Sequence, residues 1–150
     1  MEYSIFTEAP KDFNPAVEAA GCYCEFETSI LLLKRHPGRP QGNTWGVPGG
    51  KLEEGEDPRA AVIREVWEEV GINISDEGLQ EMGRLYIRLP YVDYVFHLFR
   101  KRFSVCPDII LELKEHLEAR WVSIPEALQL PLISGGREAL EFYMRFKGTF

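Results

Sequence analysis

The stretch from Asp57 to Gly71 constrains the fold more than any other part of this sequence, because it marks both ends of one helix. Asp57 is a favoured N-cap residue, and Pro58 suits a first helical turn. Gly71 stands where helices commonly end in a left-handed residue. The apolar residues of this helix share one side: Val62, Ile63, Val66, Trp67 and Val70. We therefore predict a helix at about 57–70 that packs this side against the rest of the fold.

The opposite side of the helix is acidic, since Glu65, Glu68 and Glu69 share an arc of roughly 100° at about 100° per residue. These carboxylates repel one another and oppose the helix dipole, and Arg64 offers the local relief. Helical charge runs are usually solvated faces, but a solvated face does not explain acid at this end. A divalent cation such as Mg²⁺ does explain it, because the cation binds several carboxylate oxygens. The backbone carbonyl of Gly49, in the small-residue loop before the helix, could approach the same ion.

Strand patterns precede the helix. Residues 16–26 and 29–35 are rich in strand formers around a short turn, which predicts a hairpin. Residues 36–50 contain many turn-forming residues, so we expect a long loop there. Residues 1–15 show no clear periodicity, and we expect an irregular segment.

Two further strands are predicted after the helix, at 79–89 and 92–103. Alternation in the second strand gives two faces, one with Val92, Tyr94, Phe96 and Leu98, the other with Tyr91, Asp93, Val95, His97 and Phe99. The mixed character of the latter face indicates partial burial along a cleft. Ser123 and Glu126 form a capping box, and a last helix is expected at 136–146. This mixed order predicts an α+β or layered α/β/α domain.

The composition is typical of one globular domain over residues 1–150, with 45% hydrophobic and 27% charged residues. A formal net charge of −7 argues against binding to nucleic acid or to an anionic membrane. Three cysteines cannot all pair, so we expect them to be reduced packing residues. No targeting segment or membrane span is visible, and a cytoplasmic location follows by default. The oligomeric state cannot be read from the sequence.

The residues around the predicted helix also match a known pattern. Gly50 is followed after five residues by Glu56, and after seven more by the run REVWEEVGI at 64–72. This spacing resembles the complete signature of the Nudix hydrolase superfamily, and the flanking TWGVPGG and EHLEARWVSIPEAL are similar to the family as well. The resemblance implies an α/β/α sandwich with a mixed central sheet. It also implies hydrolysis of a nucleoside diphosphate linked to another group, with Mg²⁺ or Mn²⁺ as cofactor.

The resemblance further implies roles for individual positions. The implied metal ligands are three helix glutamates, which are also the catalytic acids, and one backbone carbonyl: Glu65, Glu68, Glu69 and Gly49. Glu56 and Arg64 are implied to pair and to brace the loop around Gly50 against the helix.

One more catalytic acid is expected from a distant loop. Glu115 is the first candidate, and Glu112 and Glu118 compete with it. In the implied mechanism Mg²⁺ neutralises the phosphates, and a carboxylate accepts a proton from the water that attacks phosphorus. Glu65, Glu69 and Glu115 all remain open as that base.

Substrate contacts are expected outside the helix. Arg35 resembles a position that contacts substrate phosphate. Base or sugar contacts are expected from four aromatic residues: Trp45, Tyr91, His97 and Phe99. For Trp45 a core position is an equal alternative, and for His97 a packed position in the strand is the stronger one.

The sequence WGVPGG resembles nucleoside triphosphate hydrolases of the MutT type, so a nucleoside triphosphate cleaved to monophosphate and pyrophosphate is the first expectation. ADP-ribose and dinucleoside polyphosphates remain alternatives. Ser134 stands where MutT-type enzymes acting on oxidised guanine carry asparagine, so a preference for oxidised bases stays open.

Other functional classes fit less well. A kinase or GTPase phosphate loop is excluded, because GVPGGKL lacks the glycine–lysine spacing and the following Ser or Thr. A binding module without catalysis is disfavoured by the intact set of helix carboxylates. An isomerase of prenyl diphosphates with this fold would need a catalytic cysteine, and none of the three cysteines has a suitable position.

Overall fold

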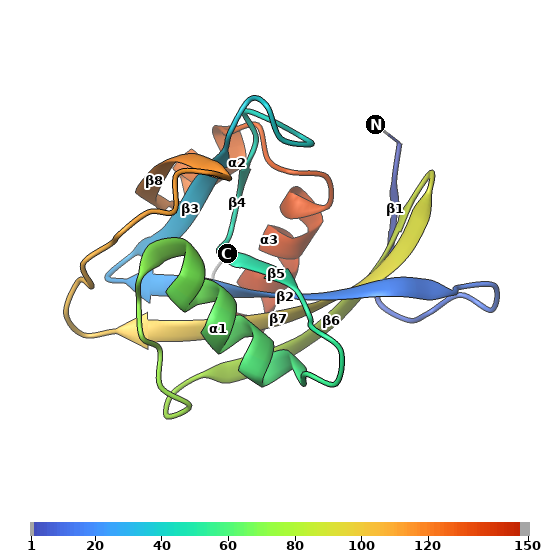
Figure 1. The fold of residues 1–150 in the computed structure, drawn as a ribbon, viewed down its shortest axis with the longest axis horizontal. Helices are drawn as coiled ribbons and strands as arrows, with labels where there is room; N and C mark the ends of the chain where they lie inside the picture. Colours follow the sequence, from blue (N-terminus) through green and yellow to red (C-terminus); the bar gives the residue numbers. More distant parts are fainter. Residues whose placement is uncertain (1, 148–150) are drawn as a thin grey trace.

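The computed structural model describes residues 2–147 of the chain. Within this range eight strands and three helices follow one another (Figure 1): β1 (Ser4–Phe6), β2 (Pro15–Phe26), β3 (Ser29–Arg35), β4 (Trp45–Gly46), β5 (Gly49–Lys51), α1 (Pro58–Val70), β6 (Gln80–Leu89), β7 (Val92–Phe103), β8 (His116–Ser123), α2 (Ile124–Gln129) and α3 (Gly136–Lys147). The strands form one mixed sheet in the order β1-β6-β7-β2-β3-β4, in which β5 also pairs with β2 and β8 with β3.

The centre of the sheet is the long parallel pair of β2 and β7, which runs from Pro15 opposite Asp93 to Phe26 opposite Phe103. The other strand pairs are antiparallel. The second edge of β2 is divided, because Ala19–Gly21 pairs with β5 before the end of the strand reaches β3. This division places β5, and the loop that leads to α1, against the middle of the sheet.

The predicted hairpin between β2 and β3 is confirmed only for the residues next to the turn. Glu25 pairs with Ile30 and Phe26 with Ser29. Further along, β3 pairs with β4 at Leu33 and Lys34, and it pairs with β8 over its whole length. Alternation of apolar residues predicted the two strands correctly, but it carries no information on which neighbour each strand takes.

Two expectations about irregular segments were wrong. Residues 1–15 contain β1, in which Ser4 pairs with Arg88 of β6, and they include the first residue of β2. Residues 36–50 contain β4 and the start of β5. These strands are two or three residues long, which is too short to show a period of two in the sequence.

The predicted ends of α1 are confirmed. The Asp57 side chain accepts a hydrogen bond from the Ala60 N–H at 2.8 Å, so it caps the first turn. Gly71 has φ of 68° and donates its N–H to the Trp67 carbonyl, as expected for a left-handed helix end. The Ser123–Glu126 capping box at α2 is also present, and β6, β7 and α3 lie within one residue of their predicted bounds.

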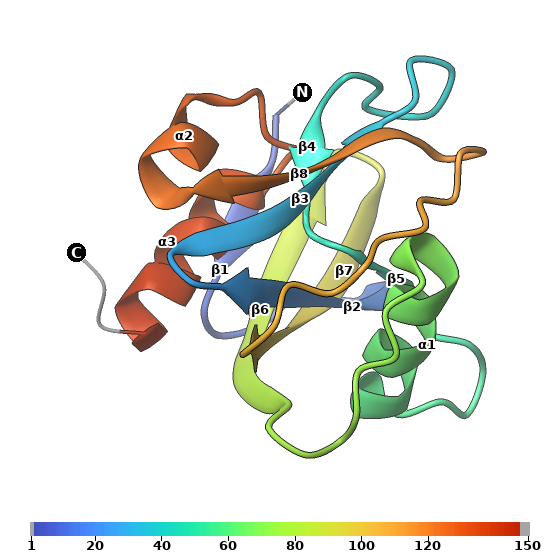
Figure 2. The ribbon, with the colours of Figure 1, turned by 90° about the vertical axis from the view of Figure 1, so that its left-hand side faces the viewer.

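The helices cover both faces of the sheet, with α1 on one side and α2 and α3 on the other (Figure 2). The cluster on the α1 side includes Val62, Val66, Val70, Leu31, Leu33 and Phe99. The cluster on the other side includes Leu85, Ile87, Leu98, Val122, Leu140 and Tyr143. The expected α/β/α sandwich is therefore confirmed. Trp67 was placed wrongly on the packed side of α1, because it is 59% exposed and lies outside the core.

No helix in residues 2–147 has the length and apolarity needed to cross a membrane.

Candidate active site

Arg64 joins the acidic side of α1 to the loop that precedes the helix. Its Nε and Nη2 donate to the two oxygens of Glu56 at 2.8 and 2.9 Å, and Nη2 also donates to the Lys51 carbonyl at 3.1 Å. Its Nη1 donates to Glu65 Oε1 at 2.9 Å and to Glu68 Oε2 at 3.1 Å. The hydrogen bonds from Arg64 lower the pKa of Glu56 to about 2. The residues expected to pair are thus in contact, and one guanidinium relieves the repulsion along the helix.

Glu65 packs directly on the backbone of β5. A Cβ atom added at Gly50 would lie 2.5 Å from the Cδ atom of Glu65, so a larger residue there would displace the carboxylate. Burial raises the pKa of Glu65, although the hydrogen bond from Arg64 acts in the opposite direction. Gly50 therefore allows the loop and this carboxylate to approach closely.

Glu69 is the buried member of the three helix glutamates, with a side chain 8% exposed. Its Oε1 accepts the N–H of Gly49 at 2.6 Å. Burial raises the pKa of Glu69 well above its ordinary value, and the nearby charges of Glu65 and Glu115 act in the same direction. Gly49 thus contacts the acidic cluster through its N–H, and a role for its carbonyl stays a prediction.

The segment after β7 lies against the end of α1. The N–H of Ile110 donates to the Val70 carbonyl and the N–H of Glu112 to the Glu69 carbonyl, both at 2.8 Å. These bonds satisfy carbonyls of the last helical turn that have no partner within the helix. They also guide the chain so that Glu115 and the first residue of β8 arrive beside Glu69.

Glu69, Glu115 and His116 form a cluster in which one ligand atom of each residue lies within 4.8 Å of the others. The imidazole of His116 is buried, with Nε2 3.8 Å from Glu69 Oε2. Among residues 2–147 no hydrogen-bond partner is present for its Nδ1. Burial lowers the pKa of His116, which favours the neutral imidazole. Glu65 and Glu68 lie outside this cluster, and their carboxylates accept hydrogen bonds from Arg64.

The sequence did not single out His116. Its one signal was its position directly after Glu115. The side chain acquires its neighbours when β8 pairs with β3, where His116 lies opposite Arg35.

The two competitors of Glu115 are engaged elsewhere. The Glu112 carboxylate accepts the backbone N–H groups of Lys114 at 2.9 Å and Glu115 at 3.1 Å, and so closes a local turn. Glu118 pairs with Arg120 at 2.8 Å. The structure thus brings Glu115, rather than Glu112 or Glu118, to Glu69, and its catalytic role stays a prediction.

The chemistry of this cluster fits a divalent cation. Carboxylate oxygens and a neutral imidazole nitrogen are ligands for such ions. The buried carboxylate of Glu69 lies close to that of Glu115, whose side chain is 44% exposed, and a positive charge between them would relieve their repulsion. The Nε2 atom of His116 faces Glu69 Oε2 at 3.8 Å, which is too far for a hydrogen bond and leaves room for an ion between them.

Two arginines lie beside the cluster. Arg35 donates its Nε to the Pro40 carbonyl at 2.7 Å, and its charge influences the pKa values of Glu69 and His116. Arg39, which the sequence did not single out, pairs with Glu115 Oε1 at 3.2 Å and keeps its side chain 47% exposed. Positive charge suited to phosphate is therefore present next to the carboxylates.

Two of the predicted aromatic contacts were wrong. Trp45 is 3% exposed, and the guanidinium of Arg120 lies 4.8 Å from the centre of its ring. Phe99 is completely buried in the cluster on the α1 side. Neither ring has an open face on which a base could stack.

The other two predicted contacts differ in exposure. His97 is 5% exposed, and its Nε2 lies 2.8 Å from Glu18 Oε1, so it is a packed strand histidine. Tyr91 is 70% exposed at the turn between β6 and β7. Figure 1 shows this turn beside β1 and away from α1.

The expectation that the mixed face of β7 borders a cleft was also wrong. Val95, His97 and Phe99 are buried, because α1 and its neighbours cover that face. Tyr94 and Phe96 on the opposite face are partly buried. Phe96 lies behind the site, since a Cβ atom at Gly21, the partner of Gly49, would be 2.9 Å from its ring.

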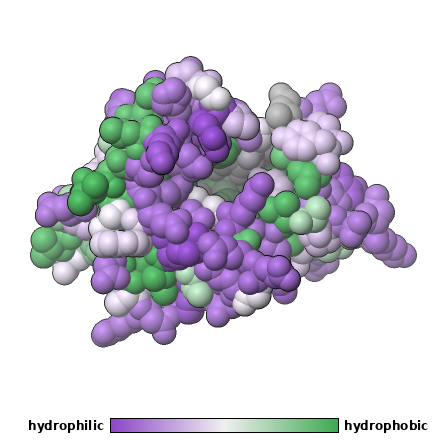
Figure 3. All heavy atoms as spheres, in the orientation of Figure 1, coloured by the Kyte–Doolittle hydropathy of each residue, from purple (hydrophilic) through white to green (hydrophobic). Residues whose placement is uncertain are grey.

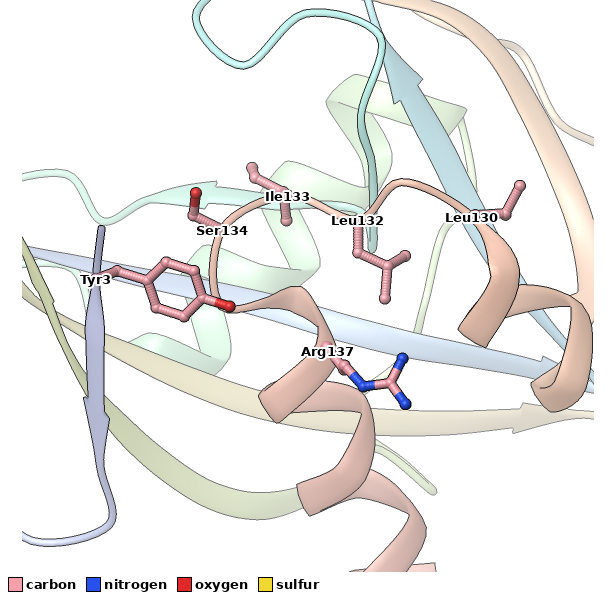
Figure 4. A pocket seen from close by; sticks show the side chains of 6 residues that line it. All are labelled: Tyr3, Leu130, Leu132, Ile133, Ser134 and Arg137. Carbon is pink, nitrogen blue, oxygen red and sulfur yellow. The ribbon is translucent and has the colours of Figure 1, made fainter. Parts of the chain in front are cut away.

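The molecular surface has a hollow in the region of β5 and β1 (Figure 3). In the view of Figure 3 a hollow lies between the loops above β5 and the edge formed by β1, with hydrophilic surface on the side of the loops and some hydrophobic surface on the side of β1. A cavity of about 200 Å³ lies at the start of α3. Figure 4 shows its lining: Tyr3, Leu130, Leu132, Ile133, Ser134 and Arg137.

Comparison with known proteins identifies the family. The family model of the NUDIX domain matches residues 15–143. CTP pyrophosphohydrolase of Escherichia coli K12 is 30% identical over 141 residues, which cover 89% of this chain and 95% of that protein. An 8-oxo-dGTP diphosphatase of Proteus vulgaris is 39% identical over 57 residues, covering 38% of this chain and 51% of the relative.

A solved structure gives the same result for the fold. The MutT protein from Methanosarcina mazei Go1 superposes with a TM-score of 0.74 at 28% identity, covering 89% of this chain and 94% of that one. The chain therefore belongs to the Nudix family and is a MutT-like hydrolase that acts on phosphoanhydride bonds.

Proposed function

We propose that this protein is a Mg²⁺- or Mn²⁺-dependent pyrophosphohydrolase that cleaves a nucleoside triphosphate to a nucleoside monophosphate and pyrophosphate. The observation that carries the proposal is the meeting of Glu69 and Glu115 beside Glu65 and Glu68 at the end of α1. Two relatives are named for triphosphate substrates, CTP and 8-oxo-dGTP, which favours this class over ADP-ribose and dinucleoside polyphosphates.

In the proposed reaction the carboxylates hold a cation and the arginines bind phosphate. A divalent cation, when bound, neutralises phosphate charge and favours attack by water. Glu65, Glu68, Glu69 and Glu115 are the residues proposed to hold it. Arg35 and Arg39 lie beside them and would bind phosphate oxygens. They thereby orient the phosphorus for attack in line with the leaving phosphate.

The reaction forms one bond from the water oxygen to phosphorus and breaks the bond from phosphorus to the bridging oxygen. Pyrophosphate leaves with that oxygen's electron pair when attack occurs at the phosphate attached to the sugar. One of Glu65, Glu69 and Glu115 takes the proton of the attacking water. In the cation-free protein burial raises the pKa values of Glu65 and Glu69, and a bound cation would act in the opposite direction.

Contacts to the base are proposed from Tyr94 and Phe96. Both rings are partly buried on the face of β7 opposite α1, and Phe96 lies next to the backbone of Gly21. Stacking on such rings contributes about 1–3 kcal/mol per base without reading its identity.

A cytoplasmic location is also proposed, in keeping with three unpaired cysteines in the described part of the chain.

The proposal is tested by a substrate panel with purified protein and Mg²⁺ or Mn²⁺. The panel contains nucleoside triphosphates, an oxidised guanine triphosphate, ADP-ribose and a dinucleoside polyphosphate, with products separated by chromatography. We expect monophosphate and pyrophosphate from at least one triphosphate. Faster hydrolysis of ADP-ribose or of a dinucleoside polyphosphate would replace the substrate class. Nucleotide binding without any hydrolysis would instead indicate a binding module.

Substitution of the acids tests the site itself. Glu68→Gln and Glu69→Gln should each lower turnover at least about a hundredfold while circular dichroism stays unchanged, because each removes a charge proposed to hold the cation. Glu54→Gln is a matched control, since Glu54 is an exposed loop acid outside the site. Near-normal turnover in both site variants would contradict the proposal.

A further inference from the structure

His116 is the buried polar residue for which the catalytic proposal gives no role. Its side chain is 6% exposed and lies at the first position of β8, next to Glu115. Among the residues that the structure describes, Nδ1 has no hydrogen-bond partner. Nε2 lies 3.8 Å from Glu69 Oε2, which is too far for a hydrogen bond. Nε2 is the ring nitrogen that faces the Glu69 carboxylate, so it is the nitrogen that an ion between the two side chains would bind.

The spacing of the cluster suits one ion. Two ligand atoms on an octahedral ion with bonds of about 2.1 Å are roughly 3.0 Å apart when adjacent and roughly 4.2 Å apart when opposite. The 3.8 Å between His116 Nε2 and Glu69 Oε2 falls between these limits. The third ligand atom, from Glu115, lies within 4.8 Å of the others, so a small closure of the cluster would complete the set.

We propose that His116 supplies an imidazole nitrogen to the cation held by Glu69 and Glu115, so that this site takes a divalent transition-metal ion in preference to Mg²⁺. Mg²⁺ favours oxygen ligands and retains its waters, whereas imidazole suits first-row transition metals. The cation then has a nitrogen ligand in addition to the carboxylate oxygens of the proposed site. The inference rests on the proposed function for the presence of a cation. It adds His116 as a ligand and a preference for transition-metal ions over Mg²⁺.

The direct test is pulsed electron paramagnetic resonance of the full chain with Mn²⁺ as the probe. A directly bound imidazole nitrogen couples to the manganese electrons, and ¹⁵N-labelling of histidine changes that signal. We expect a histidine nitrogen coupling in the unaltered protein and its loss in His116→Gln. Absence of this coupling in the unaltered protein with Mn²⁺ bound would overturn the inference.

The other two histidines provide controls that do not depend on the folding of the His116 variant. The sequence contains three histidines. If the coupling persists in His36→Gln and in His97→Gln, it belongs to His116. His97 is a matched control, because it is as buried as His116 but bonds to Glu18. Loss of the coupling in either control variant would assign the nitrogen elsewhere and overturn the inference.

Calorimetric titration with Mn²⁺ or Mg²⁺ measures the preference. We expect tighter binding of Mn²⁺, and we expect His116→Gln to weaken Mn²⁺ binding at least about tenfold while changing Mg²⁺ binding less than about threefold. Equal losses for both ions would contradict a ligand role. Mg²⁺-dependent hydrolysis without histidine coupling would overturn this inference alone. Absence of hydrolysis with either ion would overturn the proposed function.

Discussion

Glu69 is a carboxylate placed where burial disfavours its charge. Its side chain is 8% exposed, and the N–H of Gly49 stabilises one of its oxygens. Burial raises the pKa of Glu69 above the unfolded value, so the protonated form is favoured in the folded protein. The stability that this form contributes is complete below the unfolded pKa of about 4.3 and is lost as pH rises through the raised pKa. At neutral pH the ionised group therefore destabilises the cation-free protein.

Glu69→Gln should stabilise the cation-free protein at pH 7, because glutamine keeps an acceptor for the Gly49 N–H and carries no charge. We expect the midpoint of thermal unfolding in EDTA to rise by roughly 2–4 °C, the shift that about 1 kcal/mol produces in a chain of this size. The difference should close as pH is lowered towards 4. Glu68→Gln is the control, since its side chain is 53% exposed and should gain nothing from loss of charge. A lower midpoint for Glu69→Gln at pH 7 would refute this account.

At the scale of elements, α3 is held on the sheet by stacking and by a buried charge. Tyr143 stacks on Tyr23 with ring centres 4.3 Å apart, and its hydroxyl donates to Glu25 Oε2 at 2.5 Å. Arg100 of β7 donates to the other oxygen of Glu25 at 2.8 Å. Burial raises the pKa of Glu25, but the hydrogen bonds from Arg100 and Tyr143 outweigh it and leave the pKa below its ordinary value.

Tyr143→Phe should lower the free energy of unfolding by roughly 1.5–3 kcal/mol, because it removes a hydrogen bond to a buried charge and keeps the stacked ring. Chemical denaturation monitored by tryptophan fluorescence measures the change. Tyr23→Phe is the matched control, since it keeps the stack and removes a hydroxyl outside the bonds to Glu25. An equal or larger loss in the control would show that the Glu25 hydrogen bond is not the cause.

At the scale of the whole molecule, the fold brings carboxylates together in a chain whose net charge is already negative. The net charge is −7, and the carboxylates of Glu69 and Glu115 meet where the end of α1 contacts the segment before β8. An unfolded chain does not assemble this cluster. A cation that binds there therefore stabilises the folded state in proportion to its saturation.

Addition of Mg²⁺ or Mn²⁺ should consequently raise the unfolding temperature. At an ion concentration of about 100 times the Kd, binding contributes about 2.7 kcal/mol, which corresponds to a rise of roughly 5–10 °C in a chain of this size. Differential scanning calorimetry measures the shift, and EDTA should reverse it. NaCl at matched ionic strength is the control for screening and should reproduce little of the effect. If neither divalent ion exceeds this control, the cluster does not bind a cation.

The elements that were predicted correctly carry local signals of their own. Asp57 and Gly71 mark the ends of α1 by cap chemistry that acts within a single turn. The strands β6 and β7 are long enough to show alternation. The short strands β1, β4 and β5 lack this length, and they exist because a neighbouring strand is present to pair with them. Trp45 and Phe99 were misassigned for a related reason, since an aromatic residue looks the same in a sequence whether it lines a cleft or fills a core.

The sequence alone determined the acidic face of α1, because helical geometry places Glu65, Glu68 and Glu69 on one side wherever the helix packs. The tertiary structure decided which of these acids is buried and what it meets. Backbone hydrogen bonds from Ile110 and Glu112 to the last turn of α1 bring Glu115 and His116, far away along the chain, to Glu69. Such contacts depend on the path of a segment with no secondary structure of its own, and no local pattern of residues specifies that path.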